Sequence, residues 1–211
     1  YGLTFRVSPA VLIPRPETEM LVEQAVNLMA GTARPRFCEV GVGSGCISIA
    51  VLANVNVKRA TAVGLEISDA AIDIARENAE RLNVAERFEI RRSDVFEGLK
   101  DAEKFDLIVS NPPYVPAADI AGLQPEVRDH EPTHALTDGG DGLSVIKRIV
   151  AEAPKFLAPG GALLIEIGIG QADAVARLFQ VDTWLPPELV NDLQHIPRTV
   201  SARLAEIGET S

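Results

Sequence analysis

The chain has 211 residues, of which 46% are hydrophobic and 24% charged, and its formal net charge is -10. This length suits one α/β domain with a full core, and we identify no apolar stretch long enough to span a membrane. The negative charge opposes phosphate backbones, so we expect a protein or small-molecule partner, no direct nucleic-acid binding and no membrane association. The two cysteines and three histidines are too few and too scattered for a disulfide framework or a metal site.

Strand and helix patterns alternate through most of the chain. Residues 3–13 alternate loosely between polar and apolar and predict a short β-hairpin, and a helix then starts at Pro16 and ends near Gly31. The following expected strands are 36–40, 60–65, 88–91, 105–110 and 162–167, and the expected helices are 45–53, 69–82, 143–156 and 171–179. The last two strands, 188–192 and 199–204, look like a closing antiparallel pair. This order predicts a mostly parallel sheet covered on both faces.

A glycine-rich turn, Glu39 to Gly45, follows the first core strand and opens a helix. Such glycines let a ligand approach the backbone closely, although similar turns also serve NAD, FAD or packing alone. Glu66 ends the second strand, where its carboxylate can accept hydrogen bonds from both hydroxyls of a ribose. The alternative is that Glu66 caps the next helix, for which Ser68 is the better residue.

Asp94 ends the third strand, so a third acidic side chain lies at the same expected edge of the sheet. It can accept a hydrogen bond from an adenine amine, or it can merely cap a turn. A rim with three carboxylates repels a pyrophosphate and tolerates a sulfonium cation. The charge therefore favours S-adenosylmethionine over NAD as the ligand.

Asn111-Pro112-Pro113-Tyr114 directly follows the fourth strand, at the edge where open α/β sheets bind ligands. Two consecutive prolines fix φ twice and hold the nearby acceptor oxygens stiffly. The turn therefore suggests an amine or amide substrate, against the simpler interpretation of a proline-rich loop that ends a strand.

In this combination the sequence resembles a seven-stranded, Rossmann-like, S-adenosylmethionine-dependent methyltransferase, mostly parallel with an antiparallel C-terminal strand. The stretch Leu12-Ile13-Pro14-Arg15-Pro16-Glu17-Thr18-Glu19 resembles the signature of the release-factor glutamine N5-methyltransferases, the HemK or PrmC family. Further stretches fit that family at 126–128, 131–132, 139–142 and 166–168, so the resemblance extends from about residue 5 to 203. Glu39 and Glu66 depart from it, since aspartate is commoner there.

The resemblance implies methyl transfer from S-adenosylmethionine, with S-adenosylhomocysteine as product, to the glutamine of the Gly-Gly-Gln motif in peptide chain release factors. Residues 1–15 would be the hairpin and linker to an N-terminal helical docking domain, and residues 16–211 the catalytic domain. We expect a cytoplasmic, monomeric enzyme that requires no metal. The expected cofactor-binding residues are Glu39, Gly41, Gly43, Gly45, Glu66, Ile67, Asp94, Val95 and Asn111.

The expected substrate-binding residues are Asn111, Pro112, Pro113 and Tyr114, and catalysis would rest on the first, second and fourth of these. Arg15 and Glu17 are further candidates, which would close over the cofactor or bind the loop after Tyr114. Helix N-terminal charge complementarity explains Glu17 equally well.

Three other functions fit parts of this pattern. An N6-adenine or guanine-N2 methyltransferase acting on DNA or RNA uses the same Asn-Pro-Pro-Tyr chemistry on an exocyclic amine. A regulatory domain that binds S-adenosylmethionine without catalysis would keep the glycine turn. An NAD oxidoreductase would share only the glycine turn and the acidic residue after the second strand.

Overall fold

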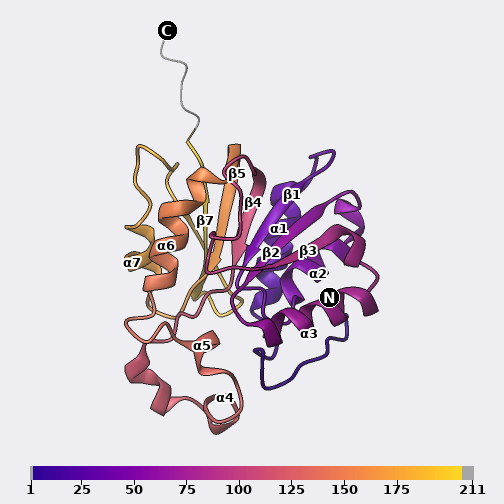
Figure 1. Ribbon diagram of the computed structural model, residues 1–211. Coiled ribbons are helices and arrows are strands. Elements are labelled where there is room, and N and C mark those ends of the chain that lie inside the picture. The colour runs from indigo at the N-terminus through magenta and orange to yellow at the C-terminus, as the bar shows by residue number, and fades with distance from the viewer. Residues whose placement is uncertain (1, 206–211) are drawn as a thin grey trace.

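The computed structural model describes residues 2–205, and within them the strands form one seven-stranded sheet (Figure 1). The strands are β1 (Arg36–Val40), β2 (Thr61–Glu66), β3 (Phe88–Arg92), β4 (Phe105–Ser110), β5 (Leu157–Glu166), β6 (Glu188–Asn191) and β7 (Pro197–Arg203). Their order is β3-β2-β1-β4-β5-β7-β6; β1 to β5 pair in parallel and β7 runs antiparallel to both of its neighbours. The predicted mostly parallel sheet with an antiparallel C-terminal strand is confirmed.

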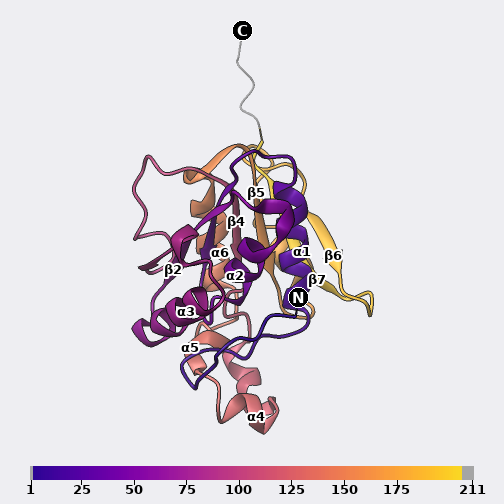
Figure 2. The same cartoon turned by 90° about the vertical axis from the view of Figure 1, so that its right-hand side faces the viewer.

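Helices cover both faces of the sheet. On one face lie α1 (Thr18–Met29), α2 (Cys46–Ala53) and α3 (Asp69–Arg81), and on the other α6 (Ser144–Glu152) and α7 (Ala172–Ala176). Two short helices, α4 (Pro125–Arg128) and α5 (Thr133–Leu136), lie beyond one end of the strands (Figures 1 and 2). The remaining turns are 3-10 helices: η1 (Val55–Val57), η2 (Ala85–Arg87), η3 (Ala117–Gly122) and η4 (Ala153–Lys155).

The core is divided by the sheet, because successive side chains of a strand point to opposite faces. On β5, Leu164 packs into the cluster beneath α1 and α2, whereas Leu163 and Ile165 pack into the cluster beneath α6. These three side chains have no measurable exposure. The same alternation directs Glu166, two residues after Leu164, toward α1.

The prediction of an N-terminal hairpin is wrong, since no strand is assigned among the described residues 2–17. Pro9 and Pro14 lack the N–H groups that a strand ladder needs. Instead, the amide of Asn78 on α3 pairs with the backbone of Arg6: Arg6 N donates to Asn78 Oδ1 at 2.7 Å and Asn78 Nδ2 donates to Arg6 O at 2.9 Å. One buried side chain thus takes the place of a partner strand.

The boundaries of several elements differ from the predicted ones; for example, the helix predicted at 171–179 is Ala172–Ala176 and the strand predicted at 199–204 is Pro197–Arg203. The first helix starts at Thr18 rather than Pro16, and the predicted helix 143–156 is α6 followed by the 3-10 turn η4. Strand β5 begins five residues earlier than predicted, because Leu157 pairs with Phe105 before the register shifts to the pair Leu107 and Ala162. None of these differences moves the ends of the strands where the predicted site lies.

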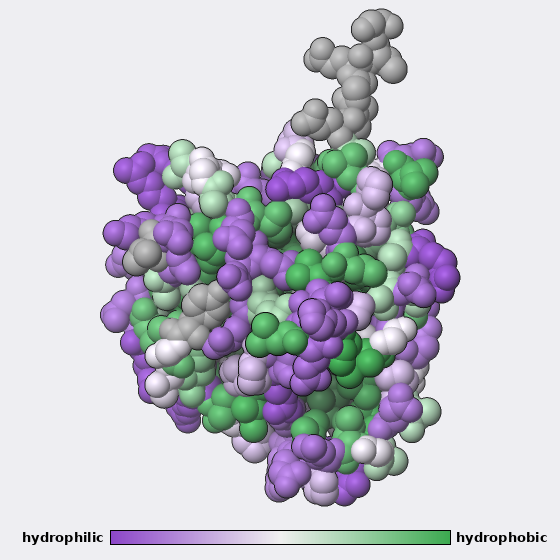
Figure 3. Space-filling view, turned by 180° about the vertical axis from the view of Figure 1, so that it is seen from behind, coloured by the Kyte–Doolittle hydropathy of each residue, from purple (hydrophilic) through white to green (hydrophobic). Residues whose placement is uncertain are grey.

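The surface opposite to that of Figure 1 mixes hydrophilic and hydrophobic residues (Figure 3). Large apolar side chains with marked exposure include Ile13, Ile67 and Ile169. Within residues 2–205, no helix has the length and apolar character needed to cross a membrane.

The sheet register brings three strand ends together at one edge. Val40 pairs with Ser110 and Ser110 pairs with Ile165. The residues that follow, Gly41, Asn111 and Glu166, are therefore neighbours along the carboxyl edge of the sheet.

Candidate active site

The glycine turn between β1 and α2 has the backbone that its composition predicts. Gly41, Gly43 and Gly45 all have positive φ, at 76°, 54° and 80°. Gly41 and Gly43 line a cavity of about 440 Å³, whereas Gly45 is not among the described residues that line it. A Cβ on Gly45 would lie 2.9 Å from Ile49 Cδ1 of α2 and 3.4 Å from Ala75 Cβ of α3, so the glycine allows the start of α2 to lie close to α3.

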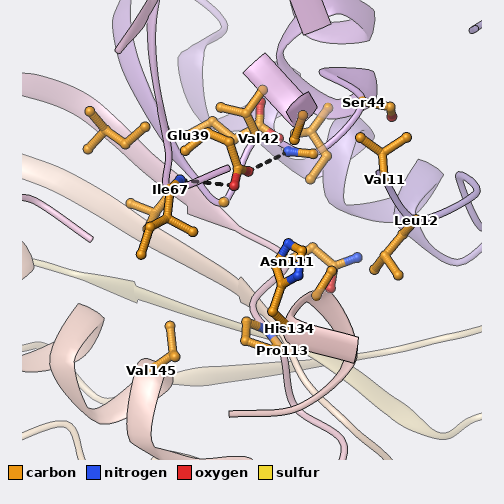
Figure 4. Close-up of a pocket in the computed structure, with 18 of the residues that line it drawn as sticks. Val11, Leu12, Glu39, Val42, Ser44, Ile67, Asn111, Pro113, His134 and Val145 are labelled. Atoms are coloured by element: carbon orange, nitrogen blue, oxygen red, sulfur yellow. Dashed lines mark hydrogen bonds between the residues drawn. The ribbon is translucent and has the colours of Figure 1, made fainter. Parts of the chain in front are cut away.

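Glu66 connects this turn to the start of α3. Its Oε2 accepts from Gly43 N at 2.9 Å, and its Oε1 accepts from Ile67 N at 2.9 Å and Ser68 N at 3.0 Å. A carboxylate has about four acceptor positions, so about one remains free. Two of these contacts are visible in Figure 4 as dashed lines. Ser68 accepts from Ala71 N and is the side-chain cap of α3, so Glu66 is not the cap.

Glu39 is fully buried at the floor of the same cavity. Its Oε2 accepts from Ser48 N at 3.0 Å, whereas Oε1 has no hydrogen-bond partner among the described residues. Burial raises the pKa of Glu39 to about 8, and the charge of Glu66 contributes in the same direction. The site therefore contains a buried acceptor atom without a donor.

Asp94 and Val95 form the third side of the cavity. Asp94 Oδ1 forms an ion pair with Arg148 Nη1 at 2.7 Å, which the sequence did not reveal. Val95 is buried with a φ of 50°, unusual for a β-branched residue, and Ser93 Oγ holds this turn by donating to Val95 O. Arg148 and Arg15 also line the cavity, so its rim is less uniformly acidic than expected.

Asn111 and Pro113 enter this cavity from the end of β4, and His134 of α5 lies beside them (Figure 4). Val11 and Leu12 from the N-terminal segment lie on one side, and Ile67 after β2 lies on the other. Eight of the nine expected cofactor residues therefore line one cavity: Glu39, Gly41, Gly43, Glu66, Ile67, Asp94, Val95 and Asn111.

A second cavity of about 390 Å³ lies on the other side of the Asn-Pro-Pro-Tyr turn. Pro112 and Tyr114 line it, together with residues of the 115–136 connection and of the turn after β5. The two cavities share four lining residues: Leu12, Arg15, Asn111 and Ala135. Asn111 is thus part of the wall between them.

Asn111 and Tyr114 are linked through one buried carboxylate. Asn111 Nδ2 donates to Thr18 Oγ1 at 3.3 Å, and Thr18 Oγ1 donates to Glu166 Oε2 at 2.9 Å. Tyr114 OH donates to Glu166 Oε1 at 3.4 Å. Burial raises the pKa of Glu166, and burial followed by the nearby charge of Glu166 raises the pKa of Tyr114 to about 12.

The backbone of the turn is also held from outside. Gln171 Nε2 donates to Tyr114 O at 2.9 Å, and Gln171 Oε1 accepts from Gly168 N. Gly142, with a φ of 76°, lies so close that a Cβ there would be 2.1 Å from Tyr114 O. The long connection 111–141 therefore returns to fix the turn from which it starts.

Arg15 lies over both cavities, and its Nη2 contacts Glu131 Oε1 at 2.6 Å. This ion pair joins the N-terminal segment to the connection after Tyr114. Binding to this connection was one of the two alternative roles given to Arg15 from the sequence. Glu17 is exposed and lies immediately before α1. Among the described residues, it lines neither cavity.

A family model described as the methyltransferase small domain matches residues 17–126. The release factor glutamine methyltransferase of Geobacter sulfurreducens is 44% identical over 203 residues, which cover 96% of this chain and 69% of that protein. The chain belongs to the release factor glutamine methyltransferase family. Membership confirms the resemblance and makes the chain an S-adenosylmethionine-dependent protein methyltransferase.

Solved structures agree on the fold of this release factor glutamine methyltransferase family member. A methyltransferase from Pyrococcus furiosus has a TM-score of 0.68 at 16% identity, covering 98% of this chain and 91% of that one. An RNA methyltransferase from Salinibacter ruber, solved in complex with S-adenosyl-L-homocysteine, has a TM-score of 0.56 at 21% identity, covering 93% and 95%. At these identities the likeness supports the Rossmann-like methyltransferase fold alone.

Three polar residues beside the Asn-Pro-Pro-Tyr turn were not predicted as site residues of this family member: Thr18, Glu166 and Gln171. Thr18 and Glu166 belong to stretches that fit the family signature, but their own roles could not be assigned. A signal was present for Glu166, since a carboxylate that ends an apolar strand is costly to bury without a partner.

Proposed function

We propose that this protein transfers a methyl group from S-adenosylmethionine to the side-chain nitrogen, N5, of the glutamine in the Gly-Gly-Gln motif of release factors. Residues 16–211 would form its catalytic domain. One observation carries the proposal: Asn111 forms a wall common to two cavities, one suited to the methyl donor and one that opens beside Tyr114. A donor and an acceptor bound on either side would meet at Asn111.

The first cavity fits the donor by its hydrogen-bonding groups. The unpartnered Oε1 of Glu39 suits an ammonium group, since a cation there would offset the cost of ionising a buried carboxylate. The remaining acceptor position of Glu66 suits a ribose hydroxyl, and the free oxygen of Asp94 suits an adenine amine. When bound, S-adenosylmethionine supplies an activated methyl group on a sulfonium.

The second cavity suits an amide side chain. An amide nitrogen is a weak nucleophile because its lone pair is delocalised into the carbonyl. Asn111 Oδ1 and the carbonyl of Pro112 would each accept one N–H, which orients the nitrogen and increases its electron density. Tyr114, which lines the second cavity, would pack beside the amide.

The transfer balances without a metal. A carbon–nitrogen bond forms as the carbon–sulfur bond breaks, and sulfur keeps the electron pair as a neutral thioether. The nitrogen then loses one proton to water, since the methylated amide is strongly acidic before it does so. The task of the protein is to hold the nitrogen in line with the methyl group.

The acceptor class follows from charge and family. A net charge of -10 disfavours naked DNA or RNA, the substrate of the alternative methyltransferase. A release factor offers the amide as part of a protein, and we expect the enzyme to act on it in the cytoplasm as a monomer.

The test is methylation with labelled S-adenosylmethionine and a purified release factor, followed by mass spectrometry of the Gly-Gly-Gln peptide. We expect one methyl group on the glutamine side chain, no methyl in a factor with glutamine replaced by alanine, and a much lower but measurable rate with Asn111→Ala. A matched reaction contains DNA and RNA oligonucleotides instead. Methylation of the oligonucleotides without methylation of the factor would overturn the proposal.

A further inference from the structure

The signature stretch Leu12 to Glu19 has no role in the chemistry described so far, except at Arg15. Thr18 belongs to this stretch and accepts a hydrogen bond from Nδ2 of Asn111. It is buried at the first residue of α1, and it lies between the amide of Asn111 and the carboxylate of Glu166. The question is what this chain of hydrogen bonds does for the site.

Three elements converge to build the chain of hydrogen bonds. Asn111 and Glu166 follow paired residues of β4 and β5, so they lie side by side at the edge of the sheet. The alternation along β5 turns Glu166 toward α1, whose first turn presents Thr18. The arrangement thus depends on the sheet register and on where α1 starts.

The hydrogen bonds have a direction, and it is set by the carboxylate. Glu166 accepts through both oxygens, Oε1 from the hydroxyl of Tyr114 and Oε2 from that of Thr18, so the hydroxyl proton of Thr18 points to Glu166 Oε2. The Thr18 oxygen must then accept, and the group on Asn111 that can donate to it is Nδ2. The other end of the amide, Oδ1, is therefore turned away from Thr18.

This direction matters because the two ends of an amide have nearly the same shape and opposite hydrogen-bonding character. With Oδ1 in place, Asn111 accepts from a substrate N–H. With the amide flipped by 180°, Asn111 would present N–H groups to the substrate nitrogen and repel it. An unrestrained asparagine at the wall of two cavities would sample both orientations.

Burying Glu166 is costly, which argues against a purely structural role. The residue is 2% exposed, and its side chain accepts hydrogen bonds from two neutral hydroxyls, those of Thr18 and Tyr114. Burial raises the pKa of Glu166, the positive charge of Arg198 opposes this rise, and the negative charge of Glu17 adds to it. An apolar residue at the end of β5 would stabilise the core more.

We propose that Thr18 and Glu166 are positioning residues that lock the amide of Asn111 with Oδ1 facing the acceptor nitrogen. Glu166 fixes Tyr114 at the same time by accepting from its hydroxyl. The inference rests on the proposed function for the identity of the acceptor, whereas the locked orientation of Asn111 is a property of the protein without substrate.

The first experiment needs no turnover. It measures the hydrogen bond of the Asn111 side-chain NH₂ that sets this orientation. In a ¹⁵N-labelled sample the side-chain NH₂ signal of Asn111 is assigned by its loss in Asn111→Ala. In Thr18→Val, which removes the hydroxyl at constant volume, the exchange of this NH₂ with water rises by about fivefold or more, because its hydrogen bond is lost. Thr18→Ser, the matched control, keeps the hydroxyl and keeps the wild-type exchange rate.

The second experiment measures turnover with saturating S-adenosylmethionine. Thr18→Val lowers kcat by about 10- to 100-fold, and Thr18→Ser restores it to within about threefold of wild type. The affinity for S-adenosylhomocysteine changes by less than about twofold in both variants, since Glu39, Glu66 and Asp94 of the first cavity are unchanged. Glu166→Gln, which also weakens the bond to Tyr114, lowers kcat in the same way.

A double-mutant cycle separates positioning from general stability. If Thr18 acts through Asn111, Thr18→Val lowers kcat no further in an Asn111→Ala background. An undiminished effect in that background, or an unchanged exchange rate in Thr18→Val, overturns the inference. Failure of wild type to methylate a release factor refutes the proposed function instead, and the exchange measurement still decides the positioning of Asn111.

Discussion

The pH dependence of stability should reveal the buried carboxyl of Glu39. The perturbation is Glu39→Gln, which keeps the size of the side chain and removes its titration. Glu39 is fully buried, Ser48 N is its hydrogen-bond donor, and its Oε1 has no partner among the described residues. The folded protein without cofactor therefore favours the protonated form of this side chain.

The magnitude follows from the pKa of Glu39, which rises from 4.5 to about 8 on folding. Below pH 4.5 both states carry the proton and the full stability is present. Between pH 4.5 and 8 the unfolded chain ionises while the folded protein keeps its proton, so stability falls as pH rises. Above pH 8 both states are ionised, and the loss reaches its full value of about 5 kcal/mol.

The assay is urea unfolding of wild type and Glu39→Gln at several pH values between 5 and 9, without cofactor. Trp184 is buried and is the single tryptophan of the chain, so its fluorescence reports unfolding in both proteins. Other groups titrate equally in the two proteins and cancel in the difference. We expect the free energy of unfolding of the variant to gain about 4 kcal/mol on wild type between pH 5 and 9. Parallel curves would refute this account of Glu39.

Three further substitutions test the packing around the site. Gly142→Ala places a Cβ against the carbonyl of Tyr114 at positive φ, so we expect a lower Tm together with a lower kcat; unchanged values of both would contradict the close contact. Arg15→Met leaves the carboxylate of Glu131 buried without a partner and should cost about 1–3 kcal/mol in urea unfolding, whereas a stability equal to wild type would show that the pair contributes nothing. Asn78→Ala should raise amide hydrogen exchange in residues 3–8 and leave the sheet protected; equal protection would show that the segment is held otherwise.

Much of the sheet is predictable because its strands are short apolar runs flanked by turn residues. Phe105–Ser110 and Phe37–Val40 are buried on both faces, so composition alone marks them as strands. The start of β5 was missed, since its first residues include Pro159 and two glycines that do not look like a strand. Pairing with β4 overrides this local preference.

In the N-terminal segment the sequence predicts strands that the structure does not have. Its alternating pattern suggests strands, but its polar groups are satisfied by Asn78, which is more than seventy residues away in the sequence. A contact of this kind depends on where α3 packs, and no local pattern contains that information.

The site was predicted where the chain order fixes it, at the carboxyl ends of β1 to β4. The sequence could not show the partners that come from elsewhere. Arg148 reaches Asp94 from α6, and Glu166 reaches Thr18 from β5. Hydrogen-bond direction and ion pairing across the cavity follow only from the packed fold.

The wall at Asn111 separates two cavities that are built largely from different segments. The first is lined mainly by the turns after β1 to β3 and by the N-terminal segment, whereas the second is lined mainly by the 112–136 connection and the turn after β5. Under the proposed function, substitutions in that connection would change the methyl acceptor more than the site of the methyl donor. In an evolving or engineered lineage, acceptor choice would thus be an exchangeable module attached to a constant donor platform.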